Sequence, residues 1–412
     1  MPSVVLRHVS VDEARAFIFS QIQPIPRFET VSLTEAVGRI AAESVESPTA
    51  VPAYTNSAMD GFAFCAADLQ GKTVALKLTG ESLAGHPYSG RVAAGEAVRI
   101  TTGAAVPADC DTVIPFEKTT ETAGTVTFSA DAVLPGDNIR HRGETVSVGD
   151  IVISRGTRLT TAHAALLANL GLARVTVTAP VRAAVIATGD ELVEPGQPCS
   201  ENHLYNANST MLTALLTALK ADVVDFGIVP DKPDAVRDAF LRASDECDIL
   251  FTSGGAAAGE TDFTHKILEA EGEIAPWQIN MRPGKPMRFG RLRGKPVFLL
   301  PGNPVACAVT FMEFARATVL ALSDAADEVT LPRTFPVILA CDVKKKEGRA
   351  EFMRATLERT TEGLSARPLK DQSSAALTTL TEADVILTLP ADGHEFPAGT
   401  VVKAQLLSEL LA

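Results

Sequence analysis

The sequence lacks paired cysteines, clustered histidines and an excess of basic residues. The six cysteines, at positions 65, 110, 199, 247, 307 and 341, form no close pair and no metal-type spacing. This pattern favours reduced thiols over a disulfide framework or a zinc site. The formal net charge of -13 argues against nucleic acid as the main partner, because too few basic residues remain to neutralise phosphates. An anionic substrate must therefore be held by local features.

Signal-type and membrane-spanning segments are also missing from the pattern. The stretch from Met1 to His8 has no apolar core of a signal peptide. No apolar run approaches the length that a bilayer requires. We therefore expect a cytoplasmic protein that has no membrane partner.

The length of 412 residues is enough for about three domains of ordinary size. Two capping boxes, Ser10 to Glu13 and Ser32 to Glu35, predict helices that end near Gln21 and Arg39. Short alternating stretches from Ser47 to about Gly149 predict a β-rich insertion, because helical spacing resumes after it. The first domain is therefore expected to be discontinuous.

From Pro180 onward, strands and helices alternate along the chain, which predicts a parallel sheet covered by helices on both faces. The expected strands are 181–187, 223–229, 248–252 and 296–300, and the expected helices are 209–220, 234–243, 262–270 and 304–322. A polar linker, 323–333, then leads to a small all-β barrel or sandwich. The predicted domains are 1–46 with 147–179 (helical, discontinuous), 47–146 (inserted, β-rich), 180–323 (three-layer α/β) and 330–412 (C-terminal β-barrel).

Three loops at the ends of these strands predict a pocket for phosphate-like anions. They are Ser253-Gly254-Gly255, the turn with Arg282 and Lys285, and Pro301-Gly302-Asn303. Glycine lets the backbone approach a ligand closely, and amides at a helix start attract anions. Asn303 as N-cap and Pro304 at the first helical position suit such a start. Each loop alone is also consistent with a plain turn or cap.

Three carboxylates are expected at the same edge of the sheet. Glu191, Asp231 and Asp262 each follow a predicted strand end. Together they suit Mg²⁺, which prefers oxygen ligands and bridges them to phosphate oxygens. The alternative is structural: Asp231 starts a turn and Asp262 caps a helix. In the insertion, Asp60 before a glycine and Thr102 at a strand end are, taken alone, turn residues.

Seven motifs in order resemble those of the molybdopterin molybdenumtransferase family, which includes MoeA and the gephyrin E domain. The resemblance runs from about Ser10 to the C-terminus. The motifs are Ser57 to Ala63, Arg99 to Ala104, Asn138 to Glu144, Thr188 to Leu192, Ser253 to Gly255 with Gly259 to Asp262, Arg282 to Pro286, and Leu300 to Ala306.

The resemblance implies a four-domain homodimer in which molybdate displaces AMP from adenylylated molybdopterin with the help of Mg²⁺. It places the active site between the α/β domain of one subunit and the insertion of the other. It implies catalytic roles for Asp60, Thr102, Glu191, Asp231 and Asp262, the last three also as metal ligands. The implied substrate-binding residues are Ser253, Gly254, Gly255, Arg282, Lys285, Pro301, Gly302, Asn303, Arg140, Arg354 and Ser374.

Two other functions remain open at this point. One is a molybdopterin adenylyltransferase, whose fold resembles the parallel-sheet domain alone. The other is a pterin-binding or scaffold relative without turnover, because Thr145 and Gln278 stand where family members often carry Asp and Lys. An adenylyltransferase and cofactor-receiving apoenzymes are the implied protein partners. The sequence does not predict a preference for molybdate or tungstate.

Overall fold

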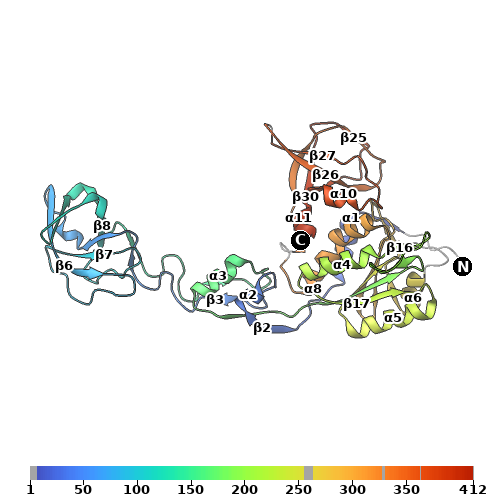
Figure 1. Cartoon of the computed structure of the whole chain (residues 1–412), viewed down its shortest axis with the longest axis horizontal. Coiled ribbons are helices and arrows are strands. Elements are labelled where there is room, and N and C mark those ends of the chain that lie inside the picture. The colour runs from blue at the N-terminus through green and yellow to red at the C-terminus, as the bar shows by residue number, and fades with distance from the viewer. Residues whose placement is uncertain (1–6, 255–262, 327–329, 362, 412) are drawn as a thin grey trace. The chain divides into compact units, whose positions relative to one another are not determined.

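The computed structural model describes residues 7–254, 263–326, 330–361 and 363–411 (Figure 1). The chain forms two compact units. The first contains Met1–Glu43, Arg155–Thr161 and Arg174–Ala412, and the second contains Ser44–Ser154 and Ala162–Ala173. The predicted insertion lies within the second unit. The boundaries of the four predicted domains stay predictions.

A six-stranded sheet is the centre of the first unit. Its order is β17-β14-β18-β23-β22-β19. The first four strands are parallel, and the pairings of β22 with β23 and with β19 are antiparallel. The strands are β14 (Arg182–Thr188), β17 (Asp222–Val229), β18 (Ile249–Ser253), β19 (Gly272–Ile274), β22 (Arg288–Leu292) and β23 (Lys295–Leu300). The helices around it include α4 (Ala207–Ala218), α5 (Pro233–Glu246) and α6 (Phe263–Glu271). The predicted α/β class is confirmed, and the antiparallel strands extend it.

Both faces of this sheet are buried. Successive side chains of a strand point to opposite faces, so each face contributes to a core of its own. Val185 and Phe251 belong to the core that contains residues of α4. Ile186 and Leu250 belong to a second core that contains residues of α5 and α6. This two-sided burial explains why the central strands β14, β18 and β23 are largely apolar.

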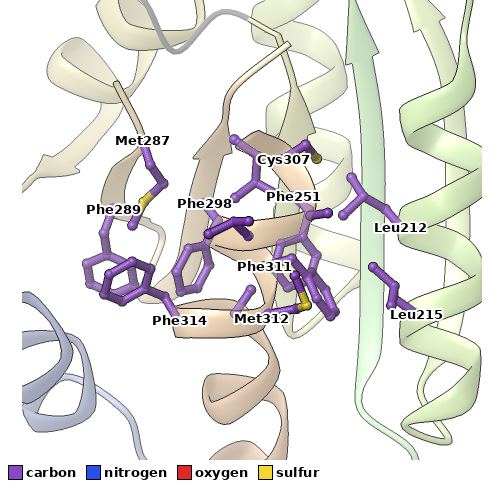
Figure 2. Close-up of a cluster of buried hydrophobic side chains, with 14 of the residues drawn as sticks. Leu212, Leu215, Phe251, Met287, Phe289, Phe298, Cys307, Phe311, Met312 and Phe314 are labelled. Atoms are coloured by element: carbon purple, nitrogen blue, oxygen red, sulfur yellow. The ribbon is translucent and has the colours of Figure 1, made fainter. Parts of the chain in front are cut away.

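One long helical segment follows β23 and packs against the sheet. It consists of α7 (Pro304–Thr310), a π-helical turn (Phe311–Ala315) and α8 (Arg316–Leu322). Figure 2 shows Phe298 and Phe311 close to Phe251, with ring centroids 5.6 and 5.8 Å from that of Phe251. Stacked and tilted aromatic contacts of this kind add to the stabilisation from apolar burial.

The same helical segment corrects one expectation from the sequence. Pro304–Leu322 is 19 residues long with a mean hydropathy of 1.7, so its length and composition would suffice to cross a bilayer. The expectation that no run approaches this length was wrong. However, 94% of the segment is buried inside the protein. It is therefore a core helix, and its apolar surface is used for packing.

The N-terminal elements up to Glu43 belong to the first unit. Helix α1 (Val11–Ser20) begins at the predicted capping box, and its buried Ala14 and Ile18 lie in the same core as Phe251. Strand β1 (Arg7–Val9) pairs with β20 (Trp277–Ile279). The second capping box opens α2 (Leu33–Ala36), next to the β2–β13 pair (Phe28–Ser32 and Arg174–Thr178). Both predicted helix starts are confirmed.

The C-terminal part is a closed β-barrel of five strands, as predicted. The strands run in the order β26-β27-β24-β30-β28, and β28 pairs back with β26. They are β24 (Phe335–Leu339), β26 (Ala350–Thr360), β27 (Gly363–Pro368), β28 (Val385–Leu389) and β30 (Val401–Leu406), with α10 (Thr378–Glu382) and α11 (Leu407–Leu411) beside them. Strand β21 (Met281–Arg282) adds to β26 and so joins the barrel to the α/β segment.

The second unit contains a six-stranded sheet of its own (Figure 1), in the order β8-β5-β7-β6-β10-β9. Its strands are β5 (Gly61–Phe64), β6 (Thr73–Ser82), β7 (Glu96–Ile100), β8 (Thr112–Pro115), β9 (Thr120–Thr122) and β10 (Thr125–Ser129). Two short pairs, β4 (Asn56–Ser57) with β11 (Ile139–Arg140) and β3 (Val45–Glu46) with β12 (Ile151–Ile153), and α3 (Thr161–Asn169) complete the unit.

Candidate functional site

The carboxyl ends of the four parallel strands open into one cavity of about 770 Å³. This is the sheet edge where open α/β folds bind ligands. Seven predicted site residues line it: Glu191, Asp231, Ser253, Gly254, Pro301, Gly302 and Asn303. They come from four strand ends that are remote in sequence, and the structure brings these four loops together at one cavity. Gly255 and Asp262 lie outside the described residues.

Two carboxylates reach the cavity from different strands. Glu191 is exposed in the turn after β14, and its side chain lies over Gly189, where an added Cβ would stand 2.7 Å from Glu191 Oε2. Asp231 follows β17, and its backbone amide donates to Asp190 Oδ1 at 3.1 Å. Within the described residues, no group of three or more His, Cys, Asp or Glu side chains is arranged to hold a metal ion.

Gly254 is required by a close approach of two strand ends. Its φ is +98°, and a Cβ at this position would lie 2.6 Å from the carbonyl oxygen of Thr188. Its amide donates to the carbonyl of Leu300 at 3.2 Å. The sequence suggested that a glycine here admits a ligand to the backbone. The structure gives a different reason, since the neighbouring atoms belong to β14.

The start of α7 differs from the sequence-based expectation. The Asn303 side chain forms no cap; its Nδ2 instead donates to Ser374 Oγ at 3.1 Å. The Val305 amide, expected to be free for an anion, donates to the carbonyl of Ser374 at 3.0 Å. A barrel loop therefore occupies this helix start. Ser374, another predicted site residue, contacts the Pro301–Asn303 loop directly.

The two cations of the predicted turn do not line the cavity. Arg282 pairs with Glu351 of the barrel at 3.3 Å, and its side chain is 59% exposed. Lys285 is half-buried. Of that turn, only Pro286 is part of the cavity wall. The expectation that Arg282 and Lys285 lie between the strand ends was therefore wrong, because neither side chain lines the cavity.

Arg354 is only 1% exposed and lies on the face of β26 opposite the barrel core, where it contacts α10. Its Nη2 donates to the carbonyl of Ser373 at 3.0 Å, and its Nε donates to Thr379 Oγ1 at 3.1 Å. Burial lowers the pKa of the guanidinium from its usual value, while the charge of Asp371 opposes this shift. Arg354 thus fixes the loop that presents Ser374 to the cavity rim.

Asp60 and Thr102 form a local pair in the second unit. The Thr102 amide and hydroxyl both donate to Asp60 Oδ1, at 2.7 and 3.0 Å. Gly61 allows strands β5 and β8 to approach, because a Cβ there would lie 2.0 Å from the carbonyl oxygen of Ile114. Arg140 is exposed on β11. The arrangement gives the insertion a carboxylate with an ordered hydroxyl beside it.

Three family models match consecutive parts of the chain. They are the MoeA N-terminal region (domain I and II) over residues 9–171, the probable molybdopterin binding domain over 184–321, and the MoeA C-terminal region (domain IV) over 336–407. A molybdopterin molybdenumtransferase of Haemophilus influenzae is 35% identical over 98% of this chain and 100% of its own length. The chain belongs to the molybdopterin molybdenumtransferase family.

Other members agree with this assignment. A Staphylococcus aureus molybdopterin molybdenumtransferase is 30% identical over 96% of this chain and 94% of its own length. The crystal structure of the molybdopterin biosynthesis moeA protein from Pyrococcus horikoshii matches with a TM-score of 0.84 at 27% identity, over 97% of this chain and all of that one. The predictions of family, fold class and enzyme are confirmed, and the family implies molybdopterin and molybdate as substrates.

Sequence reasoning missed part of the wall of this molybdenumtransferase-family cavity. Tyr205, Asn206 and Asn208 line it from the start of α4 and the segment before it. Asn206 caps α4 by accepting the Ser209 amide at 3.2 Å. The available signal was two asparagines directly before the helix predicted at Ser209. Asparagine at a helix start is normally explained by capping alone, so this pattern does not by itself predict a cavity wall.

Proposed function

We propose that this chain inserts molybdenum from molybdate into adenylylated molybdopterin and releases AMP, using the cavity at the carboxyl edge of the sheet. The observation that carries the proposal is the convergence of Glu191, Asp231 and the Pro301–Asn303 loop on one cavity. Its size suits a ligand larger than a simple anion. The full-length similarity to molybdopterin molybdenumtransferases supports the same activity.

The chemistry requires that two anions meet, so their repulsion has to be offset by fixed donors and cations. In this proposal Ser253, Gly254, Gly255 and Pro301 to Asn303 hold the phosphate and pterin groups. Ser374 contacts the same loop, and Arg354 orders the segment that carries it. In this proposal Arg140 of the insertion supplies positive charge for the oxyanions, whereas Arg282 and Lys285 do not line the cavity. The roles of these residues are proposals.

Mg²⁺ fits the donor set of the cavity. Glu191 and Asp231 contribute carboxylates at one wall, and Mg²⁺ is typically bound by one or two carboxylates together with waters and substrate phosphates. Glu191, Asp231 and the predicted Asp262 would hold it. The bound ion would neutralise phosphate charge as AMP leaves.

The proposed activity is tested by supplying purified protein with adenylylated molybdopterin, molybdate and Mg²⁺. We expect AMP release that depends on molybdate and is abolished by EDTA. Release of no AMP by folded protein would contradict the proposal. ATP-dependent adenylylation of molybdopterin would instead favour the adenylyltransferase alternative.

We also propose a cytoplasmic homodimer in which Asp60 and Thr102 of one subunit complete the cavity of the other. If so, Asp60→Asn and Glu191→Gln proteins are each inactive, but subunit exchange between them restores activity. In a random mixture half of the dimers carry one intact site, so about a quarter of wild-type activity is expected. A mixture that stays inactive although mass spectrometry detects heterodimers would contradict the shared site. The adenylyltransferase and the cofactor-receiving apoenzymes are the proposed protein partners.

A further inference from the structure

Asn208, in the first turn of α4, connects two loops of the cavity. Its Nδ2 donates to Ser253 Oγ at the end of β18 and to the carbonyl oxygen of Gly302, each at 2.7 Å. A carbonyl oxygen only accepts, so the amide orientation is fixed with its nitrogen toward Gly302. All three residues line the cavity.

The oxygen of the Asn208 side-chain amide differs from its nitrogen, because it has no hydrogen-bond partner within the described residues. Asn208 is 7% exposed, and its Oδ1 accepts no hydrogen bond within the described chain. A buried acceptor without a partner costs about 1–3 kcal/mol. Buried polar groups in folded proteins normally have a hydrogen-bond partner, so this one needs an explanation. Features that cost folding free energy without a local compensation are concentrated at functional sites.

The contacts of Gly302 and Asn303 extend this connection. Gly302 is held by Asn208 from the side of α4, and Asn303 is held by Ser374 from the barrel. The Pro301–Asn303 loop is therefore fixed from two directions, while Ser253 is fixed by the same amide that holds Gly302. Precise placement of binding groups by such supporting hydrogen bonds is worth up to about 100-fold in rate.

We propose that Asn208 is a positioning residue. Its NH₂ group holds the Ser253 end of β18 and the Pro301–Asn303 loop at a fixed position relative to each other for substrate binding. The proposal rests on the proposed function for the identity of the substrate. The two hydrogen bonds of the Asn208 NH₂ group are present whatever the substrate is. This role also explains the unpaired Oδ1, because the residue is needed for its two donors.

The test separates positioning from ordinary stabilisation. Asn208→Ala removes the unpaired oxygen but also takes the donor away from Ser253 Oγ and the Gly302 carbonyl. These effects oppose each other, so the melting temperature should stay within about 2 °C of wild type. Hydrogen–deuterium exchange at residues 250–254 and 300–306 should become about tenfold faster, because both loops lose a tether. AMP binding, measured by calorimetry, should weaken about tenfold, and kcat/KM should fall about 10- to 100-fold.

Ser209→Ala is the matched control. Ser209 follows Asn208 on the same helix, is 4% exposed, and its Oγ also lacks a partner within the described chain, but it does not belong to the cavity wall. Exchange, AMP binding and turnover should match wild type. Asn208→Asp keeps the volume but faces Gly302 with an acceptor, so it should loosen both loops at least as much as Asn208→Ala.

Unchanged exchange at both loops in Asn208→Ala, or faster exchange throughout the first unit with a large fall in melting temperature, would overturn the proposal. Failure of the proposed function gives a different result. In that case wild type releases no AMP, while the exchange difference between wild type and Asn208→Ala remains.

Discussion

Glu191→Gln is expected to lower kcat/KM by about 100-fold or more while the melting temperature stays unchanged. The carboxylate is exposed at the cavity wall and has no hydrogen-bond or ion-pair partner within the described residues, so folding does not depend on it. Its negative charge is what a bound cation needs, and a lost charge interaction at a reacting centre typically costs two to three orders of magnitude.

The effect is measured as AMP release across a range of Mg²⁺ concentrations. The activity of Glu191→Gln should half-saturate at higher Mg²⁺ than that of wild type. Glu201→Gln is the control, because Glu201 is exposed in the same region but is not part of the cavity wall. Wild-type turnover in Glu191→Gln would remove this carboxylate from the proposed metal site.

Arg15→Met is expected to destabilise the first unit by about 3–5 kcal/mol at pH 8, because it leaves a buried carboxylate without its cation. Glu313 on the π-helical turn is 2% exposed and accepts from Arg15 Nη2 at 2.9 Å and Gln405 Nε2 at 3.0 Å. Methionine keeps an apolar stem of similar length. The loss should therefore come from the missing charge.

The pH dependence of this loss has a definite sign. Burial raises the pKa of Glu313, and the charge of Arg15 opposes that shift. Since the folded-state pKa lies above the unfolded one, the ionised carboxylate costs stability above it, and protonation relieves that cost as pH falls. Without Arg15 the pKa rises further, so the deficit of Arg15→Met should be largest at pH 8 and smaller at pH 5.

Urea unfolding of the first unit at both pH values measures this difference. Arg7→Met is the control, because the Arg7–Glu13 pair is exposed on both sides and should contribute little. Equal losses at pH 5 and pH 8 would show that Arg15 acts through packing of its stem and not through its charge.

Local patterns were sufficient to predict most of the fold. The alternation of apolar strands and helices after Pro180 fixed the α/β class, because strands buried on both faces must be apolar throughout. The two capping boxes predicted the starts of α1 and α2, since both of their hydrogen bonds join residues within one turn. Glu191, Asp231 and the Pro301 loop could be placed together because the carboxyl ends of parallel strands share one edge.

The errors at the site share a physical cause, which is competition from residues distant in sequence. Asn303 was expected to cap α7, but Ser374 takes its side chain and also the Val305 amide. Arg282 was expected in the pocket, but Glu351 pairs with it. Asn208 was missed because both of its acceptors lie more than forty positions away. No local pattern encodes such partners.

The barrel and the α/β segment share contacts that would be lost if the two were separated. Ser374 satisfies the start of α7, Gln405 binds the buried Glu313, and β26 continues the backbone pairing of β21. Excision of the α/β segment as a free-standing module would therefore expose a charged core residue and unpaired backbone. The sheet and the barrel of this chain therefore form one structural unit. A domain exchange between relatives would have to transfer both of them together.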